Sequence, residues 1–74
     1  MNWQPNMQAV CITPVACLQL GETYRVEKVI HGGRLSRDEL NGDGLVVKDR
    51  YGALVPIPEG YTGFDARRFL RGLE

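Results

Sequence analysis

The chain has one histidine, two cysteines and no net charge. Each of these features argues against a class of protein. Its nine basic and nine acidic residues cancel, whereas a nonspecific nucleic-acid binder usually carries a net positive field. Cys11 and Cys17 are too few for a disulfide framework or a four-ligand zinc site. We expect them to be two buried or half-buried thiols in a reducing cytosol.

Long apolar runs are also missing. No segment approaches the ~20 consecutive apolar residues of a membrane span, and the N-terminus lacks the basic start and apolar stretch of a signal peptide. We therefore expect a soluble, cytoplasmic protein. The 74 residues are enough for one domain, and their 43% hydrophobic content is enough for one core.

The pattern of apolar residues predicts a mainly β domain of four to five short antiparallel strands. Strands are expected over residues 7–12, 23–30, 45–48 and 53–57. In the second strand, Tyr24, Val26 and Ile30 are expected to share one face, with Tyr24 in the core. Arg25, Glu27 and Val29 are expected on the opposite face. Pro56 and Pro58 predict that the last strand lies at an edge or leaves the ladder there. So small a sheet must curl to bury one face, which predicts an SH3-like open barrel.

Residues typical of turns and helix caps lie between these strands. Asp49 to Gly52 suits a type I turn, with aspartate first and glycine in the last or bulge position. Asp65 can cap a short helical turn over residues 66–68, which returns residues 69–70 to the core.

Two segments of the chain are expected to move. Residues 1–6 are read as a flexible arm, and residues 7–74 as a single domain with a mobile loop at 31–44, which is rich in glycine. Within that loop, Ser36 and Glu39 match the spacing of a helix capping box.

The order of these motifs resembles a group of small SH3-like barrel proteins encoded by bacteriophages. The residues that carry the resemblance are Val10-Cys11-Ile12, Gly21-Glu22-Thr23-Tyr24-Arg25-Val26, Val46-Val47-Lys48-Asp49-Arg50-Tyr51-Gly52 and Arg67-Arg68-Phe69. In size the chain is also similar to small Xanthomonas phage regulators that bind host RNA polymerase. The resemblance implies a binding module in the bacterial host cytoplasm that docks on a host protein, with RNA polymerase as the candidate, and modulates transcription.

No constellation of residues predicts catalysis, a cofactor or a metal. His31, the single histidine, has no paired nucleophile or carboxylate in the sequence and is expected in an exposed turn. Residues 41–44 lack the alternating carboxylates and final glutamate of a calcium loop. Gly32-Gly33 is not followed by the lysine and helix of a phosphate-binding loop. We therefore expect a non-enzyme without cofactors.

Arginine outnumbers lysine seven to two, and its planar guanidinium group favours interfaces over simple solvation. Tyr51 and Tyr61 lie in turns and are candidates for exposed contact, while Trp3 either folds back over the core or anchors a partner. The candidate partner-binding residues are Trp3, Arg34, Arg37, Tyr51, Arg67, Arg68 and Arg71.

Other interpretations of these residues stay open. The arginines are either surface charges paired with acidic residues of the chain or contacts to an acidic partner. An alternative function is an SH3-like module that binds nucleic acid through the C-terminal arginines. A further alternative is a small structural or accessory phage protein. The free protein is expected to be a monomer.

Overall fold

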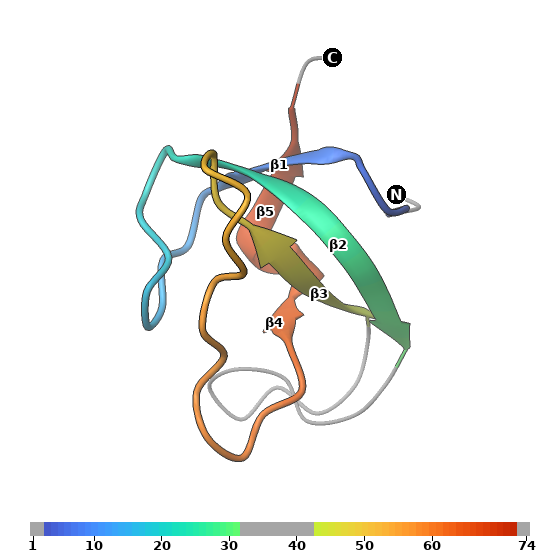
Figure 1. Cartoon of the computed structure of the whole chain (residues 1–74), viewed down its shortest axis with the longest axis vertical. Coiled ribbons are helices and arrows are strands. Elements are labelled where there is room, and N and C mark those ends of the chain that lie inside the picture. Colours follow the sequence, from blue (N-terminus) through green and yellow to red (C-terminus); the bar gives the residue numbers. More distant parts are fainter. Residues whose placement is uncertain (1–2, 32–42, 73–74) are drawn as a thin grey trace.

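The computed structural model describes residues 3–31 and 43–72, which form one five-stranded antiparallel sheet (Figure 1). The strands are β1 (Gln8–Cys11), β2 (Thr23–His31), β3 (Asp43–Lys48), β4 (Phe64–Asp65) and β5 (Phe69–Arg71), in the order β4-β3-β2-β1-β5. A short 3₁₀ turn, η2 (Ala66–Arg68), joins the two edge strands β4 and β5. The sheet therefore curls back on itself, and the prediction of a small, mainly β open barrel is confirmed.

The core lies inside this curl and follows the alternation of side chains along the strands. Ala9 from β1, Tyr24 from β2 and Val47 from β3 all point inward. The ring of Tyr24 meets the ring of Phe69 edge-on, with centroids 6.3 Å apart and planes at 81°. The buried hydrophobic cluster comprises Trp3, Ala9, Cys11, Leu18, Tyr24, Val26, Leu45, Val47, Val55, Phe64 and Phe69.

A bulge in β2 changes which of its side chains reach the core. Val26 lies opposite Val47, but Lys28 lies opposite the neighbouring Val46, so Glu27 is the extra residue. Beyond the bulge the alternation is shifted, and Val29 packs against the core. The prediction that Val29 lies on the face opposite the core is therefore wrong.

The N-terminal residues that the structure describes are packed against the sheet. Trp3 is only 8% exposed and belongs to the core. The amide of Asn6 donates to the carbonyl of Val26 at 2.8 Å, and Nη1 of Arg25 donates to the carbonyl of Asn6 at 2.6 Å. Residues 3–6 are thus held against β2. Of the two alternatives for Trp3, the structure shows the ring folded back over the core.

The expected strand at 53–57 is reduced to a single bridge. Leu54 pairs with Lys48, and the amide of Val55 donates to the carbonyl of Val47 at 3.0 Å. Pro56 and Pro58 have no amide hydrogen with which to extend the ladder. The chain leaves the sheet there, and β4 pairs with β3 instead, with Phe64 opposite Leu45.

Both ends of the loop expected at 31–44 belong to strands, because β2 continues to His31 and β3 begins at Asp43. These two residues are Cα partners, and Nδ1 of His31 lies 2.9 Å from Oδ1 of Asp43. His31 is exposed but lies in a strand rather than a turn. The expected capping box at 36–39 lies outside the described residues.

Leu18 and Leu20 form a matched pair for testing the core, because they lie two residues apart in one loop and are 4% and 70% exposed. We expect Leu18→Ala to lower the free energy of unfolding by ~2–5 kcal/mol, since it removes buried methyl groups and leaves a cavity. Leu20→Ala should change it by no more than ~0.5 kcal/mol. Chemical denaturation of both variants measures the difference, and equal losses would contradict this core.

Candidate functional site

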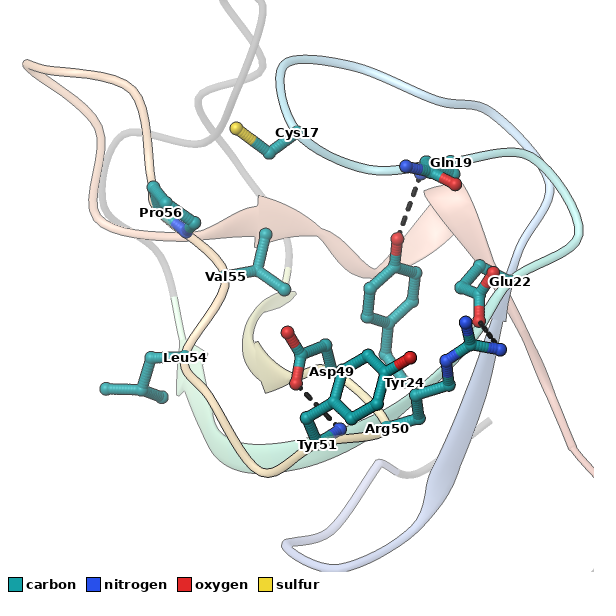
Figure 2. A pocket seen from close by; sticks show the side chains of 10 residues that line it. All are labelled: Cys17, Gln19, Glu22, Tyr24, Asp49, Arg50, Tyr51, Leu54, Val55 and Pro56. Atoms are coloured by element: carbon teal, nitrogen blue, oxygen red, sulfur yellow. Dashed lines mark hydrogen bonds and ion pairs between the residues drawn. The ribbon is translucent and has the colours of Figure 1, made fainter.

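A groove of about 220 Å³ lies between the segment that joins β1 to β2 and the turn that follows β3 (Figure 2). Cys17, Gln19 and Glu22 line it from the first segment, and residues 49–51 and 54–56 line it from the second. Tyr24 of β2 also lines the groove and lies between the two walls in Figure 2.

The turn after β3 is held by the aspartate that the sequence predicts. Oδ1 of Asp49 accepts hydrogen bonds from the amides of Tyr51 at 2.9 Å and Ala53 at 3.0 Å. The amide of Gly52 donates to the carbonyl of Asp49, and Gly52 has a φ of 85°, which side-chain-bearing residues rarely adopt. The predicted turn is confirmed, and its hydrogen bonds fix the backbone that carries Tyr51.

Tyr24 connects the core to the other wall of the groove. Its ring is 4% exposed, and its hydroxyl accepts a hydrogen bond from the amide of Gln19 at 3.0 Å (Figure 2). Burial raises the pKa of the Tyr24 hydroxyl above its ordinary value, and the bond from Gln19 offsets part of that effect. The neutral phenol is thus the favoured form, and it anchors the loop.

The rim of the groove carries exposed apolar side chains. Tyr51 is 79% exposed and Leu54 is 57% exposed. The guanidinium of Arg50 lies 5.0 Å from the centroid of the Tyr51 ring, and its Nη1 lies 3.8 Å from Oε1 of Glu22 on the opposite wall. Arg50 therefore contacts groups on both walls of the groove.

A second depression, of about 340 Å³, adjoins the first. The two share Tyr24, Asp49 and Arg50 as lining residues. The second is lined in addition by Arg25 and by Lys48, whose Nζ lies 3.1 Å from Oε1 of Glu27. The two depressions thus form one continuous surface, in which the large apolar side chains line the first depression and most of the cations line the second.

The C-terminal arginines do not form a common contact surface. Arg68 is 5% exposed, and its Nη1 donates to the carbonyl of Thr13 at 3.2 Å. Its predicted role as a partner-binding residue is corrected: Arg68 ties η2 to the chain after β1. Arg67 is exposed, but its Nη2 pairs with Oδ2 of Asp65 at 2.7 Å. Arg71 is exposed on β5.

Among the other predicted contact residues that the structure describes, Tyr51 alone lies in the groove. Trp3 is buried, which corrects its place among the candidate partner-binding residues, and Tyr61 is half-buried. Arg34 and Arg37 lie outside the described residues. Leu54 and Arg50 were not identified as contact residues from the sequence. Pro56 could have indicated Leu54, because a proline that ends the returning strand leaves the apolar residues before it partly exposed.

Cys17 was also placed wrongly, since it is exposed whereas Cys11 is fully buried. Ala16 has a φ of 53° in the loop before Leu18, and this turn leaves Cys17 on the side of the groove. Within residues 3–31 and 43–72, no three histidine, cysteine, aspartate or glutamate side chains gather as a metal site would require.

Comparisons with protein-family models, curated proteins and solved structures gave no match. In the part of the chain that the structure describes, no helix has the length and apolar character needed to cross a membrane.

The two thiols should differ sharply in reactivity. Burial raises the pKa of the Cys11 thiol, an effect partly offset by a backbone hydrogen bond at Thr13 and by the charge of Arg68. We expect iodoacetamide to label Cys17 in the folded protein and Cys11 only after unfolding, as read by mass spectrometry with Cys17→Ser as control. Equal labelling rates would contradict the assigned burial.

The same shift gives a pH dependence. Because the folded pKa of Cys11 is raised, the unfolded chain loses its proton first, so this contribution to stability is complete below the ordinary thiol pKa and falls as pH rises above it. Cys11→Ala should remove this part of the alkaline loss in denaturation curves. An unchanged alkaline slope in that variant would count against the shift.

Asp65 should be essential to the closure between β4 and β5. The carboxylate is 2% exposed and accepts from the amide, Nε and Nη2 of Arg67. We expect Asp65→Ala to lower the free energy of unfolding by about 1–2 kcal/mol, because it removes the side chain that caps η2 and pairs with Arg67. Asp65→Asn keeps an acceptor and should cost less. An alanine variant that melts like the wild type would refute this role.

Proposed function

We propose that the protein is a non-enzymatic binding module that docks another protein in the groove beside the 49–52 turn. The observation that carries this proposal is the pair of large apolar side chains, Tyr51 and Leu54, exposed on the rim of a groove that Tyr24 also lines. Exposed apolar surface around a concavity is typical of interaction sites, and tyrosine is enriched among residues that dominate binding energy.

The fixed geometry of this surface also supports binding. The turn carrying Tyr51 is held by Asp49, and the opposite wall is tied to Tyr24 through Gln19. Side chains on a backbone that is already ordered lose less conformational freedom when a partner binds.

Binding of nucleic acid through the C-terminal arginines has less support. A phosphate-binding surface needs several exposed cations on one face. Arg68 is buried, and the exposed guanidinium of Arg67 pairs with Asp65, so Arg71 is left as the exposed arginine of that group that could meet phosphate. A protein partner therefore fits the described surface better than a nucleic-acid backbone.

The partner itself is proposed from the resemblance to phage barrel proteins. It makes a bacterial host protein the first class to test and RNA polymerase the first candidate, with an effect on transcription. A protein of this size can act by occupying a surface that another factor needs. A structural or accessory role in a phage particle is the alternative.

Leu54 and Leu70 provide a matched test of the groove, because they are 57% and 54% exposed and Leu70 lies on β5, away from the groove lining. We expect Leu54→Ala and Tyr51→Ala to weaken capture of the partner about tenfold or more, as residues central to an interface do. Leu70→Ala should leave capture unchanged.

The measurement uses purified bacterial RNA polymerase and, in parallel, bacterial lysate, with bound proteins quantified by mass spectrometry. A partner captured equally by all three variants would place the binding surface elsewhere. If the wild-type protein does not retain RNA polymerase but captures another protein that Tyr51→Ala fails to capture, RNA polymerase is rejected as the partner and the binding function stands.

A further inference from the structure

The second depression extends the groove with a different chemistry. Its lining contains three cationic side chains, Arg25, Lys48 and Arg50, against one carboxylate, Asp49. Oδ1 of that carboxylate already accepts two backbone hydrogen bonds within its own turn. The lining of the second depression therefore has more cations than carboxylates, and the carboxylates that pair with Lys48 and Arg50 lie outside this lining.

Each of these cations already has a contact, but all of these contacts lie at the surface, where a carboxylate of a ligand can replace Glu22 or Glu27. Lys48 pairs with Glu27 on the surface, where the side chains are 39% and 46% exposed, and such a pair contributes little in water. Nη1 of Arg25 donates to a neutral carbonyl, that of Asn6. Arg50 lies 3.8 Å from Glu22 and is 67% exposed, so its guanidinium keeps donors that can reach a ligand.

The first depression is the apolar half of the same surface by its large side chains, although Gln19, Glu22 and Asp49 also line it. Tyr51 and Leu54 stand on its rim, and Val55 and Pro56 add to its wall. Arg50 lines both halves. A ligand that fills both depressions must therefore place apolar groups on one side of Arg50 and negative charge on the other.

Resting on the proposed binding function, we infer that the occupant is a short acidic peptide segment with an apolar side chain next to its carboxylates. The apolar side chain lies against Tyr51 and Leu54, and the carboxylates face Arg25, Lys48 and Arg50. Arginine forks hold carboxylates with two parallel hydrogen bonds, and complementary charge fixes the direction of a bound segment.

The sizes of the depressions agree with a peptide. Volumes of about 220 and 340 Å³ lie below or near the lower end of the ~300–1,000 Å³ of small-molecule sites. Each depression accommodates individual side chains rather than a whole cofactor. Two adjoining depressions suit successive side chains of one segment.

The test uses a bead library of peptides about eight residues long. Every second position carries glutamate, glutamine or lysine, chosen at random, and the positions between them carry leucine, tyrosine or proline. Selected peptides are measured by fluorescence anisotropy, and the binding surface is mapped by amide shifts in NMR spectra. We expect net-acidic peptides to be selected, with shifts at residues of both depressions and with affinity that falls as salt rises.

Variants of single arginines test whether the cations of the groove contribute to the affinity for an acidic peptide. Arg50→Gln should weaken an acidic peptide about tenfold while leaving its glutamine analogue nearly unchanged, which a purely structural loss would not do. Arg71→Gln is the matched control, because this exposed arginine lies on β5 outside both depressions, and it should leave both peptides unchanged.

The other outcomes overturn the inference in distinguishable ways. Selection of uncharged or basic peptides, with shifts in the groove, overturns the acidic assignment and leaves the binding function standing. A single-stranded oligonucleotide that binds the cationic half more tightly than any selected peptide overturns the peptide assignment. If no peptide of the library shifts an amide signal of the groove in the NMR spectrum, the inference is rejected. The capture experiment with Tyr51→Ala and Leu70→Ala tests the proposed function separately.

Discussion

The side chain of Tyr24 does two things that the rest of the structure depends on. Its ring packs edge-on against Phe69, which brings β2 and β5 together inside the curled sheet. Its hydroxyl accepts the amide of Gln19 and so fixes the loop that forms one wall of the groove. Core packing and groove geometry therefore share one residue, because a phenol combines a large apolar body with a polar end that needs a partner.

Two prolines shape the other wall. Pro56 and Pro58 cannot donate to a ladder, so the chain after the turn pairs with β3 at one bridge and then leaves the sheet. Its departure leaves the far half of β3 free to pair with β4. The same constraint that shortens the hairpin keeps Leu54 uncovered, which is why the groove has an apolar rim.

Local signals in the sequence were sufficient for the strands with clear alternation and for the capped turns. Tyr24 and Val26 face the core, Asp49 and Gly52 form their turn, and Asp65 caps η2, because each depends on neighbours within a few residues. The groove is different. It joins segments about thirty residues apart, so Leu54 and Arg50 carry no local mark of their position in it.

Charge and aromatic character were the least reliable guides to exposure. Trp3 sits in a polar stretch yet is buried, and Arg68 is buried because a carbonyl across the fold accepts its hydrogen bond. Both positions are decided by contacts between segments distant in the chain. A composition-based list of contact residues selects such side chains because their type is common at interfaces, whereas tertiary packing decides which of them remain available.

The pairing of β1 with β5 also affects the order in which the sheet folds. β1 has β2 on one side and β5 on the other, and its partners in β5 lie about sixty residues away along the chain. The pairings of β1 with β2 and of β2 with β3 join strands that are neighbours in the sequence. The β1–β5 pairing closes a much longer loop at a higher cost in chain entropy, so we expect closure of the barrel to be the slow step of folding.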